Sequence, residues 1–540
     1  MVVAEGQANR LTVVTTTSNA VPPRTDDPGV PWWKTATVYQ IYPRSFCDTT
    51  GNGVGDLGGV IAHLDHLEWL GVDAIWLSPV FTSPMVDHGY DVADYCDIDP
   101  IFGDLEQFDA LVAEAHRRGL RVVLDWVPNH TSDQHPWFVD SRSSLDSPHR
   151  DWYVWREGNP DTPPNNWQAA LSKGPAWTWD AATESWYLHL FTPNQPDLDW
   201  STPAVRDAML DTLRFWLDRG VDGFRMDVVH LIAKPAGLPN RPGGPGQVIV
   251  DIDEPEVHDH LRGIRAVLDE YPQEPMSVGE VYLLDPAQVA TYYGDGDELH
   301  LSFNFIALHG PWDAEHWNRE IRAAQGAFDP VGAWPTWVLS NHDQTRHRQR
   351  YGGSERVARA AAVLLLTLRG TPFLYAGEEL GLVDAEVPRE RQQDPQGRRD
   401  GCRAPIPWDA SPEHGWQRPD NWLPFPPEAT TRNAAVLRDD PGSILHLYRR
   451  LLELRASSRA LQTGSMEVLD AGAGLVAWDR RHGDDRLVVA VNMTDGPCRF
   501  ELDGDWTVVI DSSDGGARPH DGTMPQQAGL VLAPSTHTHE

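Results

Sequence analysis

The chain has 540 residues and a formal net charge of −35 at neutral pH. Nucleic acids and anionic membranes bind proteins through basic patches, so this charge argues against both as partners. The length is enough for an α/β barrel of about 250 to 400 residues with a smaller second domain. A small neutral molecule is therefore the expected partner.

The first 30 residues are polar and lack the charged start and apolar run of a secretory signal, which predicts a disordered leader over residues 1–30. The longest apolar run, residues 360–368, is too short to span a bilayer and predicts a buried helix. Together these features predict a cytoplasmic protein without membrane contact. The cysteines form no CxxC or Cys/His cluster and are expected to be reduced thiols: Cys47, Cys96, Cys402 and Cys498.

Short apolar runs typical of β-strands alternate along the chain with amphipathic helical patterns. Helices are predicted at residues 57–70, 105–118 and 204–219, where apolar residues recur every three or four positions. This alternation predicts an α/β fold, a parallel (β/α)8 TIM barrel whose reactive residues lie at the C-terminal strand ends. The predicted strands are residues 38–42, 74–77, 121–125, 223–227, 276–279, 301–305, 336–339 and 372–375.

Two segments do not fit the barrel pattern. The connection after the third strand is very long and dense in Trp, Pro and Asn, which predicts an inserted subdomain B over residues 131–200. The barrel itself would then comprise residues 31–130 and 201–456, ending with a helix at 444–456. Short alternating runs at 474–478, 486–491 and 506–510 predict an antiparallel β domain over residues 457–540.

Carboxylates follow four of the predicted strands, at the end where a barrel carries its reactive groups. They are Asp125, Asp227, Glu280 and Asp343. Cleavage of a glycosidic bond needs this arrangement, because one acid protonates the leaving oxygen while a second, ionised carboxylate attacks or stabilises the sugar. A single acid after a strand is more often a helix cap, but the ordered set indicates catalysis.

Several motifs occur in a fixed order: QIYPRSF at 40–46, DHGYD at 87–91, DWVPNH at 125–130, QPDLD at 195–199, GFRMD at 223–227, Glu280, and NHD at 341–343. In this order the chain resembles the α-glucosidase and oligo-1,6-glucosidase branch of the α-amylase superfamily, glycoside hydrolase family 13. The resemblance covers nearly everything from Trp33 onward. It implies that Asp227 is the nucleophile, Glu280 the general acid/base and Asp343 the carboxylate that steadies the distorted sugar.

The charges of these residues agree with such roles. Arg225 lies two positions before Asp227 on the same strand face, so its positive charge should help to keep Asp227 ionised. Glu280, by contrast, must carry a proton before it can act as an acid. The resemblance also implies contacts to substrate for a further set of residues: Asp87, Tyr90, His130, Phe191, Arg225, His342 and Arg399.

Residues 48–56, DTTGNGVGD, place oxygen atoms at alternate positions with glycines between them. Such a loop suits Ca²⁺ or Mg²⁺, although it lacks the twelfth-position glutamate of an EF-hand. We favour a structural cation over the alternative, an Asx-rich turn. No organic cofactor is predicted. The expected metal ligands are Asp48, Thr50, Asn52, Val54 and Asp56.

The function expected from these residues is an exo-acting retaining α-glucosidase that releases α-glucose from short oligosaccharides. A transferring or isomerising relative, of the trehalose- or sucrose-forming type, stays open because it shares the first half-reaction. A non-catalytic scaffold is disfavoured by the intact carboxylates. Linkage preference stays open as well, since Val228 resembles α-1,6-cleaving members and residues 251–254 resemble maltose-preferring ones. We expect a monomer or a homodimer.

Overall fold

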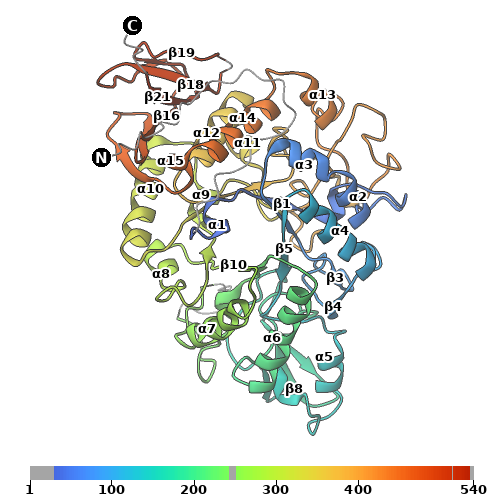
Figure 1. Cartoon of the computed structure of the whole chain (residues 1–540). Helices are drawn as coiled ribbons and strands as arrows, with labels where there is room; N and C mark the ends of the chain where they lie inside the picture. The colour runs from blue at the N-terminus through green and yellow to red at the C-terminus, as the bar shows by residue number, and fades with distance from the viewer. Residues whose placement is uncertain (1–28, 243–250, 514, 536–540) are drawn as a thin grey trace, which may run out of the picture.

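The computed structural model describes residues 29–242, 251–513 and 515–535. Its centre is an eight-stranded parallel sheet with the order β11-β10-β9-β5-β2-β1-β13-β12 (Figure 1). Thr336 Oγ1 donates to Ser302 O at 2.7 Å and joins the two outer strands, so the sheet closes into a barrel. The predicted TIM barrel is confirmed. Its strands are β1 (Val38–Ile41), β2 (Ala74–Leu77), β5 (Arg121–Trp126), β9 (Gly223–Met226), β10 (Met276–Gly279), β11 (Leu301–Ser302), β12 (Thr336–Val338) and β13 (Thr371–Tyr375).

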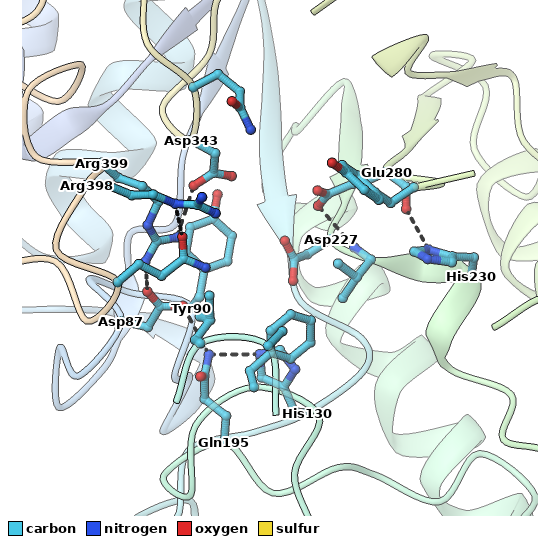
Figure 2. A pocket seen from close by; sticks show the side chains of 17 residues that line it. Asp87, Tyr90, His130, Gln195, Asp227, His230, Glu280, Asp343, Arg398 and Arg399 are labelled. Carbon is cyan, nitrogen blue, oxygen red and sulfur yellow. Dashed lines mark hydrogen bonds and ion pairs between the residues drawn. The ribbon is translucent and has the colours of Figure 1, made fainter. Parts of the chain in front are cut away.

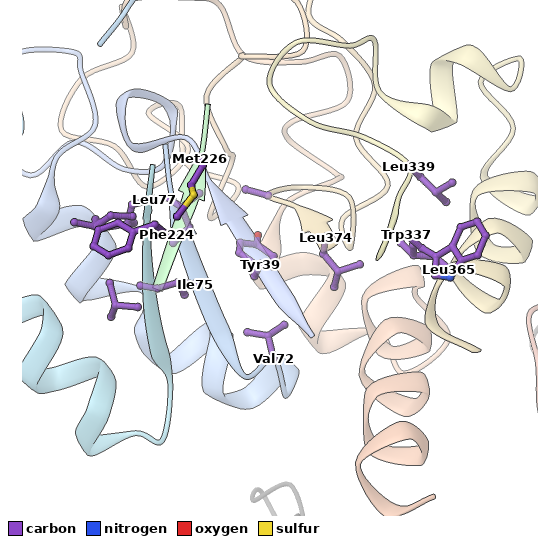
Figure 3. Close-up of a cluster of buried hydrophobic side chains, with 14 of the residues drawn as sticks. Tyr39, Val72, Ile75, Leu77, Phe224, Met226, Trp337, Leu339, Leu365 and Leu374 are labelled. Atoms are coloured by element: carbon purple, nitrogen blue, oxygen red, sulfur yellow. The ribbon is translucent and has the colours of Figure 1, made fainter. Parts of the chain in front are cut away.

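Successive side chains of a barrel strand enter two different cores, because their directions alternate. Tyr39 and Ile75 belong to the large cluster between the strands and the surrounding helices, which Figure 3 shows. Their neighbours Val38, Ala74 and Trp76 belong to a second cluster that fills the barrel. Burial on both faces explains why these strands are apolar runs rather than alternating ones.

Helices surround the sheet and mostly begin where the sequence predicts. The predicted helix at 57–70 begins at its predicted residue but is divided at His63 into α2 (Leu57–Ala62) and α3 (Leu64–Leu70). His63 Nδ1 lies 2.9 Å from the carbonyl oxygen of Gly59, which an unbroken helix would use for its own backbone, and the imidazole stacks on Trp408. The helices are α1 (Trp32–Thr35), α2 (Leu57–Ala62), α3 (Leu64–Leu70), α4 (Leu105–Arg117), α6 (Pro203–Asp218), α7 (Glu256–Asp269), α8 (Pro286–Thr291), α9 (Phe305–His309), α10 (Ala314–Phe328), α11 (His347–Arg350), α12 (Glu355–Thr367), α13 (Ala434–Asp439), α14 (Ile444–Ser457) and α15 (Arg459–Gln462).

Two smaller units extend from the barrel, one inserted between β5 and α6 and one at the C-terminal end of the chain (Figure 1). Between β5 and α6, the helix α5 (Pro136–Ser141) accompanies an antiparallel sheet of β6 (Trp155–Glu157), β8 (Ser185–Leu188) and β7 (Trp177–Asp180). A short hairpin, β3 (Phe81–Thr82) with β4 (Asp94–Ile98), follows β2 and was not predicted.

After α15 the chain forms the antiparallel sheet β14-β15-β16-β21-β18-β19, which confirms the C-terminal β domain. The exact domain boundaries stay predictions. The strands of this part are β14 (Ser465–Leu469), β15 (Leu475–His482), β16 (Asp485–Asn492), β17 (Cys498–Arg499), β18 (Trp506–Asp511), β19 (Arg518–Pro519), β20 (Thr523–Met524) and β21 (Ala528–Pro534).

Several other expectations concern the chain as a whole. The apolar run at 360–368 lies mostly in α12 and is buried, as predicted. No helix among the described residues is long and apolar enough to cross a bilayer. The four cysteines are free thiols. Most of the predicted leader, residues 1–28, lies outside the described residues.

Candidate active site

A pocket of about 330 Å³ lies at the C-terminal ends of the barrel strands (Figure 2). Asp227 directly follows β9 and Glu280 directly follows β10, while Asp343 comes from the segment after β12. The pocket lies within the size range usual for small-molecule sites. The side chains that line it are Asp87, Tyr90, His130, Ala170, Leu171, Phe191, Gln195, Asp227, Val228, His230, Glu280, Tyr282, Asp343, Gln344, Gln396, Arg398 and Arg399.

Three carboxylates share the guanidinium of Arg225 at the base of this pocket. Arg225 Nη1 donates to Asp125 Oδ1 at 2.8 Å and to Asp227 Oδ1 at 2.7 Å, and Nη2 donates to Glu280 Oε2. The strand register explains part of this cluster, because Asp125 of β5 and Arg225 of β9 are directly opposite each other. The Arg225 side chain is only 3% exposed, so it lies behind the pocket wall and does not line the pocket.

Burial raises the pKa of the Asp227 carboxyl well above its ordinary value. Arg225 opposes this shift, as the sequence predicted, but Glu280 and Asp125 add to it. Burial also raises the pKa of Asp125, to about 6. Three carboxylates share one cation, so their ionisations are coupled, and a proton bound there belongs to the group rather than to one side chain. Arg225 therefore acts on Asp227 in the predicted direction, but burial outweighs it.

Arg399 joins three carboxylates at the far end of the pocket. It donates from Nη2 to Asp87 Oδ1 at 2.7 Å, from Nη1 to Asp343 Oδ1 at 3.0 Å and from Nε to Asp394 Oδ1 at 2.7 Å. Arg403 Nη2 adds a second bond to Asp343 Oδ1, at 2.9 Å. Burial acts to raise the pKa of Asp343, but His342, which is protonated only at low pH, and these two arginines outweigh it and hold that pKa well below the usual range.

His342 lies behind Tyr90 rather than on the pocket surface. Its Nε2 is 2.6 Å from Tyr90 Oη, the two rings stack at 5.5 Å, and its side chain is 1% exposed. Gln40 Nε2 lies 2.7 Å from His342 Nδ1, so the imidazole is held from both sides. Tyr90 in turn donates to Asp125 Oδ2 at 3.1 Å. The structure therefore brings His342 to the site, as a side chain that fixes Tyr90 and Asp125.

His130 and Phe191 both line the pocket, as their predicted contacts with substrate require. The two rings are 5.1 Å apart, and His130 Nε2 lies 3.2 Å from Gln195 Nε2. Burial lowers the pKa of His130 to about 4 and that of His342 to about 3. Both imidazoles are therefore neutral at neutral pH and act through hydrogen bonds, not through charge.

A family model described as the α-amylase catalytic domain matches residues 40–464. The chain belongs to the α-amylase family. Over 524 residues it is 44% identical to a probable α-glucosidase of Rhizobium meliloti (strain 1021), covering 91% of this chain and 94% of that protein. It is 37% identical to an oligo-1,6-glucosidase of Parageobacillus thermoglucosidasius, covering 87% and 92%. The crystal structure of an α-glucosyl transfer enzyme, XgtA, superimposes with a TM-score of 0.86 at 38% identity, covering 93% and 99%.

These matches confirm the resemblance to the α-glucosidase branch of the α-amylase superfamily. The pocket of this α-amylase family member also contains residues that sequence reasoning did not assign. Gln195 Nε2 donates to Asp87 Oδ2 at 3.3 Å, and Tyr282 and Arg398 line the wall. Signals for them were present: Gln195 begins the QPDLD motif, Tyr282 lies two positions after Glu280, and Arg398 directly precedes Arg399.

The predicted cation loop of this α-amylase family member uses its acidic oxygens within the loop. Asp48 Oδ1 accepts from the backbone N–H groups of Thr50 and Gly51, and its Oδ2 accepts from Gly53 N–H. Asp56 accepts from Thr49 and from Gly59, while Asn52 accepts from Val54. These oxygens already have hydrogen-bond partners in the chain, so the loop as arranged is an Asx-rich turn, and a cation would have to use their remaining lone pairs.

The bound cation stays a prediction. A loop that holds a cation and an Asx-rich turn without one should differ in melting temperature in chelator and in metal content. A bound ion stabilises the folded protein and should be lost to excess chelator. An occupied loop therefore gives a lower Tm in chelator with turnover retained, together with about one metal ion per chain by elemental analysis. An unchanged melting curve and no metal would reject the site.

Proposed function

We propose that this glycosidase is an exo-acting retaining α-glucosidase that releases glucose from the non-reducing end of short α-glucosides. The names of the similar proteins support α-glucosidase or oligo-1,6-glucosidase activity. The observation that carries the proposal is the buried ion pair between Arg399 and Asp87 in the pocket wall, from which we infer that the pocket is closed beyond the catalytic carboxylates. A pocket with one blocked end accepts the end of a chain and excludes its middle.

In the proposed reaction, Glu280 donates its proton to the glycosidic oxygen while Asp227 attacks the anomeric carbon. The C–O bond to the leaving sugar breaks, and a glucosyl ester of Asp227 forms. Glu280, now ionised, then removes a proton from water, which attacks the same carbon and releases Asp227. Asp343, held as a carboxylate by Arg399 and Arg403, would bind sugar hydroxyls through both steps.

Retention of configuration requires the two catalytic carboxyl groups to lie about 5 Å apart. Asp227 and Glu280 accept from the two terminal nitrogens of the same guanidinium, which supports such a short separation. Proton NMR of the first product tests this directly. Retention gives α-glucose before mutarotation, and initial β-glucose would contradict the double displacement.

Chain-length preference is a second test of the proposal. Asp87, Arg399 and Gln195 surround the blocked end, so only Phe191 and its neighbours are available to sugars on the reducing side. We expect maltose- or isomaltose-type di- and trisaccharides to exceed soluble starch by a wide margin in kcat/KM. Viscosity and released glucose, measured together, decide the matter. A fall in starch viscosity before glucose appears would mean mid-chain cleavage and an open cleft.

Transfer of glucose to a sugar is the second candidate, supported by the likeness to an α-glucosyl transfer enzyme. It differs only in the acceptor that attacks the glucosyl ester. Val228 and Leu171 line the pocket, and the Val228 N–H donates to Glu280 Oε2 at 3.3 Å. Product analysis with maltose, isomaltose, sucrose and trehalose at high concentration separates the two. Both release the leaving sugar, but transfer also yields new oligosaccharides, whereas hydrolysis yields monosaccharides only.

A further inference from the structure

A second cavity, of about 210 Å³, lies at the opposite end of the barrel, where the strands begin. Trp33 and Lys34 come from α1, which precedes β1, while His300 precedes β11 and Trp334 precedes β12. Arg265 of α7 completes the charged part of the wall. None of these residues lines the active-site pocket, so this cavity is a separate site.

Lys34 is the exceptional residue of this cavity. Its Nζ lies 5.4 Å from the ring centre of Trp33 and 5.6 Å from that of Trp334. In the part of the chain that the structure describes, no carboxylate forms an ion pair with it. The neighbouring cations do have such partners, since Arg265 pairs with Asp269 and Arg369 pairs with Asp329, both at 2.7 Å.

The surroundings of Lys34 disfavour its charge in the absence of an anion. Burial lowers the pKa of the Lys34 ammonium, and Arg369 acts in the same direction. A half-buried cation without a counter-charge is costly to the folded protein, and an anion beside it would reverse both effects. The chain has a net charge of −35 and only three lysines, so an uncompensated lysine in a cavity is unusual here.

His300 supplies a second donor. Its Nδ1 lies 3.1 Å from the backbone nitrogen of Ser277, which can only donate, so Nδ1 must be the acceptor. Burial lowers the pKa of His300 to about 3, which keeps the ring neutral. The hydrogen of this neutral ring is therefore on Nε2. The cavity thus combines an ammonium group that has no ion-pair partner among the described residues with one imidazole N–H donor.

The aromatic walls are less available to a ligand than they first look. The Trp334 ring has Lys34 near it and the Arg369 guanidinium at 4.5 Å, and Trp33 has Lys34 and the His300 ring at 5.4 Å. Sugar stacking needs a free aromatic face, whereas these faces already contact cations or another ring. A lysine ammonium acts as a point charge and suits phosphate, while planar carboxylates pair best with arginine.

We propose that this cavity binds a phosphate group, either inorganic phosphate or a small phosphate monoester, on Lys34 and His300. The ligand would bind the folded chain only, so it would stabilise the barrel by mass action. It would act on stability rather than on turnover, because the active-site pocket is at the other end of the strands.

Thermal unfolding of the full chain tests the proposal in phosphate and in chloride at equal ionic strength. The variants are Lys34→Met and, as a matched control, Lys173→Met, which removes an exposed lysine of the inserted segment. We expect a saturable rise of Tm in phosphate for the parent and for Lys173→Met, and none for Lys34→Met. An equal rise in all three proteins is a general salt effect and would overturn the proposal.

Phosphorus-31 NMR gives a direct readout that does not depend on unfolding. Inorganic phosphate and a hexose phosphate are each titrated with the parent and with Lys34→Met. Saturable broadening of the phosphorus signal with the parent that is lost in the variant supports the site. The ligand that binds more tightly shows whether the site prefers inorganic phosphate or a phosphate monoester. No saturable broadening with the parent for either ligand, or the same broadening with Lys34→Met, refutes it.

Discussion

Asp227→Asn is expected to lower turnover by several orders of magnitude and, at the same time, to raise the melting temperature. The amide cannot form the glucosyl ester, so the first half-reaction has no nucleophile. The substitution also leaves only two carboxylates, Asp125 and Glu280, around the buried guanidinium of Arg225. This relieves the repulsion between the negative charge of Asp227 and those two carboxylates. A gain of about 1 kcal/mol is typical when an active site is relieved in this way.

The gain in stability of Asp227→Asn over the parent should increase as the pH rises. The pKa of Asp227 is raised in the folded protein from its ordinary value of 3.8, so ionisation costs stability as the pH rises above that value. Asparagine does not ionise. The difference in Tm between Asp227→Asn and the parent should therefore be small near pH 3.8 and grow toward neutral pH.

The control for this variant is Asp207→Asn, which changes an exposed aspartate of α6 and should leave Tm and activity nearly unchanged. Trapping the glucosyl ester in the parent protein with a slow fluorinated glucosyl donor adds a chemical test. The label should appear on the peptide that contains Asp227. A label elsewhere, or an Asp227→Asn variant that melts below the parent at neutral pH, would contradict the assignment.

Glu280→Gln is expected to lower hydrolysis of maltose by about 10² to 10⁴-fold, the usual contribution of a general acid. Gln can still accept from Arg225, so the fold should persist. Substrates whose leaving group departs without protonation, such as aryl glucosides with an acidic phenol, should lose far less in the first step. The measurement that decides is the ratio of the loss in rate on maltose to the loss in rate on the aryl glucoside.

Glu315→Gln, in an exposed first turn of α10, is the matched control for this second variant. It makes the same chemical change away from the pocket and should retain parental rates on both substrates. Equal losses on maltose and on the aryl glucoside in Glu280→Gln would indicate a disturbed pocket, and a near-parental rate on maltose would show that another group donates the proton.

Much of the fold follows from the sequence because the barrel strands are short apolar runs with both faces buried. The C-terminal sheet was harder to predict. β21 (Ala528–Pro534) is apolar in nearly every position instead of alternating, and β14 (Ser465–Leu469) is mostly part-exposed. Likewise, the break at His63 depends on Trp408, which is far away in the sequence, so no local pattern contains it.

For the site, the sequence predicts which residues gather, because several of them follow strands that must end at the same rim. Their mutual arrangement depends on register. Asp125 contacts Arg225 only because β5 and β9 pair with those two residues opposite each other. The position of His342 behind Tyr90 needs the loops after β2 and β12 to meet, which no motif encodes. The assigned roles of these residues stay proposals.

The ion pair between Asp87 and Arg399 also bears on when the pocket comes into existence. These two residues are 312 positions apart in the chain, so during synthesis the blocked end of the pocket cannot form until most of the protein has left the ribosome. Contacts of such long sequence separation form slowly, since the intervening chain must be closed first. A refolding chain should accordingly regain its helices and buried tryptophans earlier than its ability to recognise a chain end.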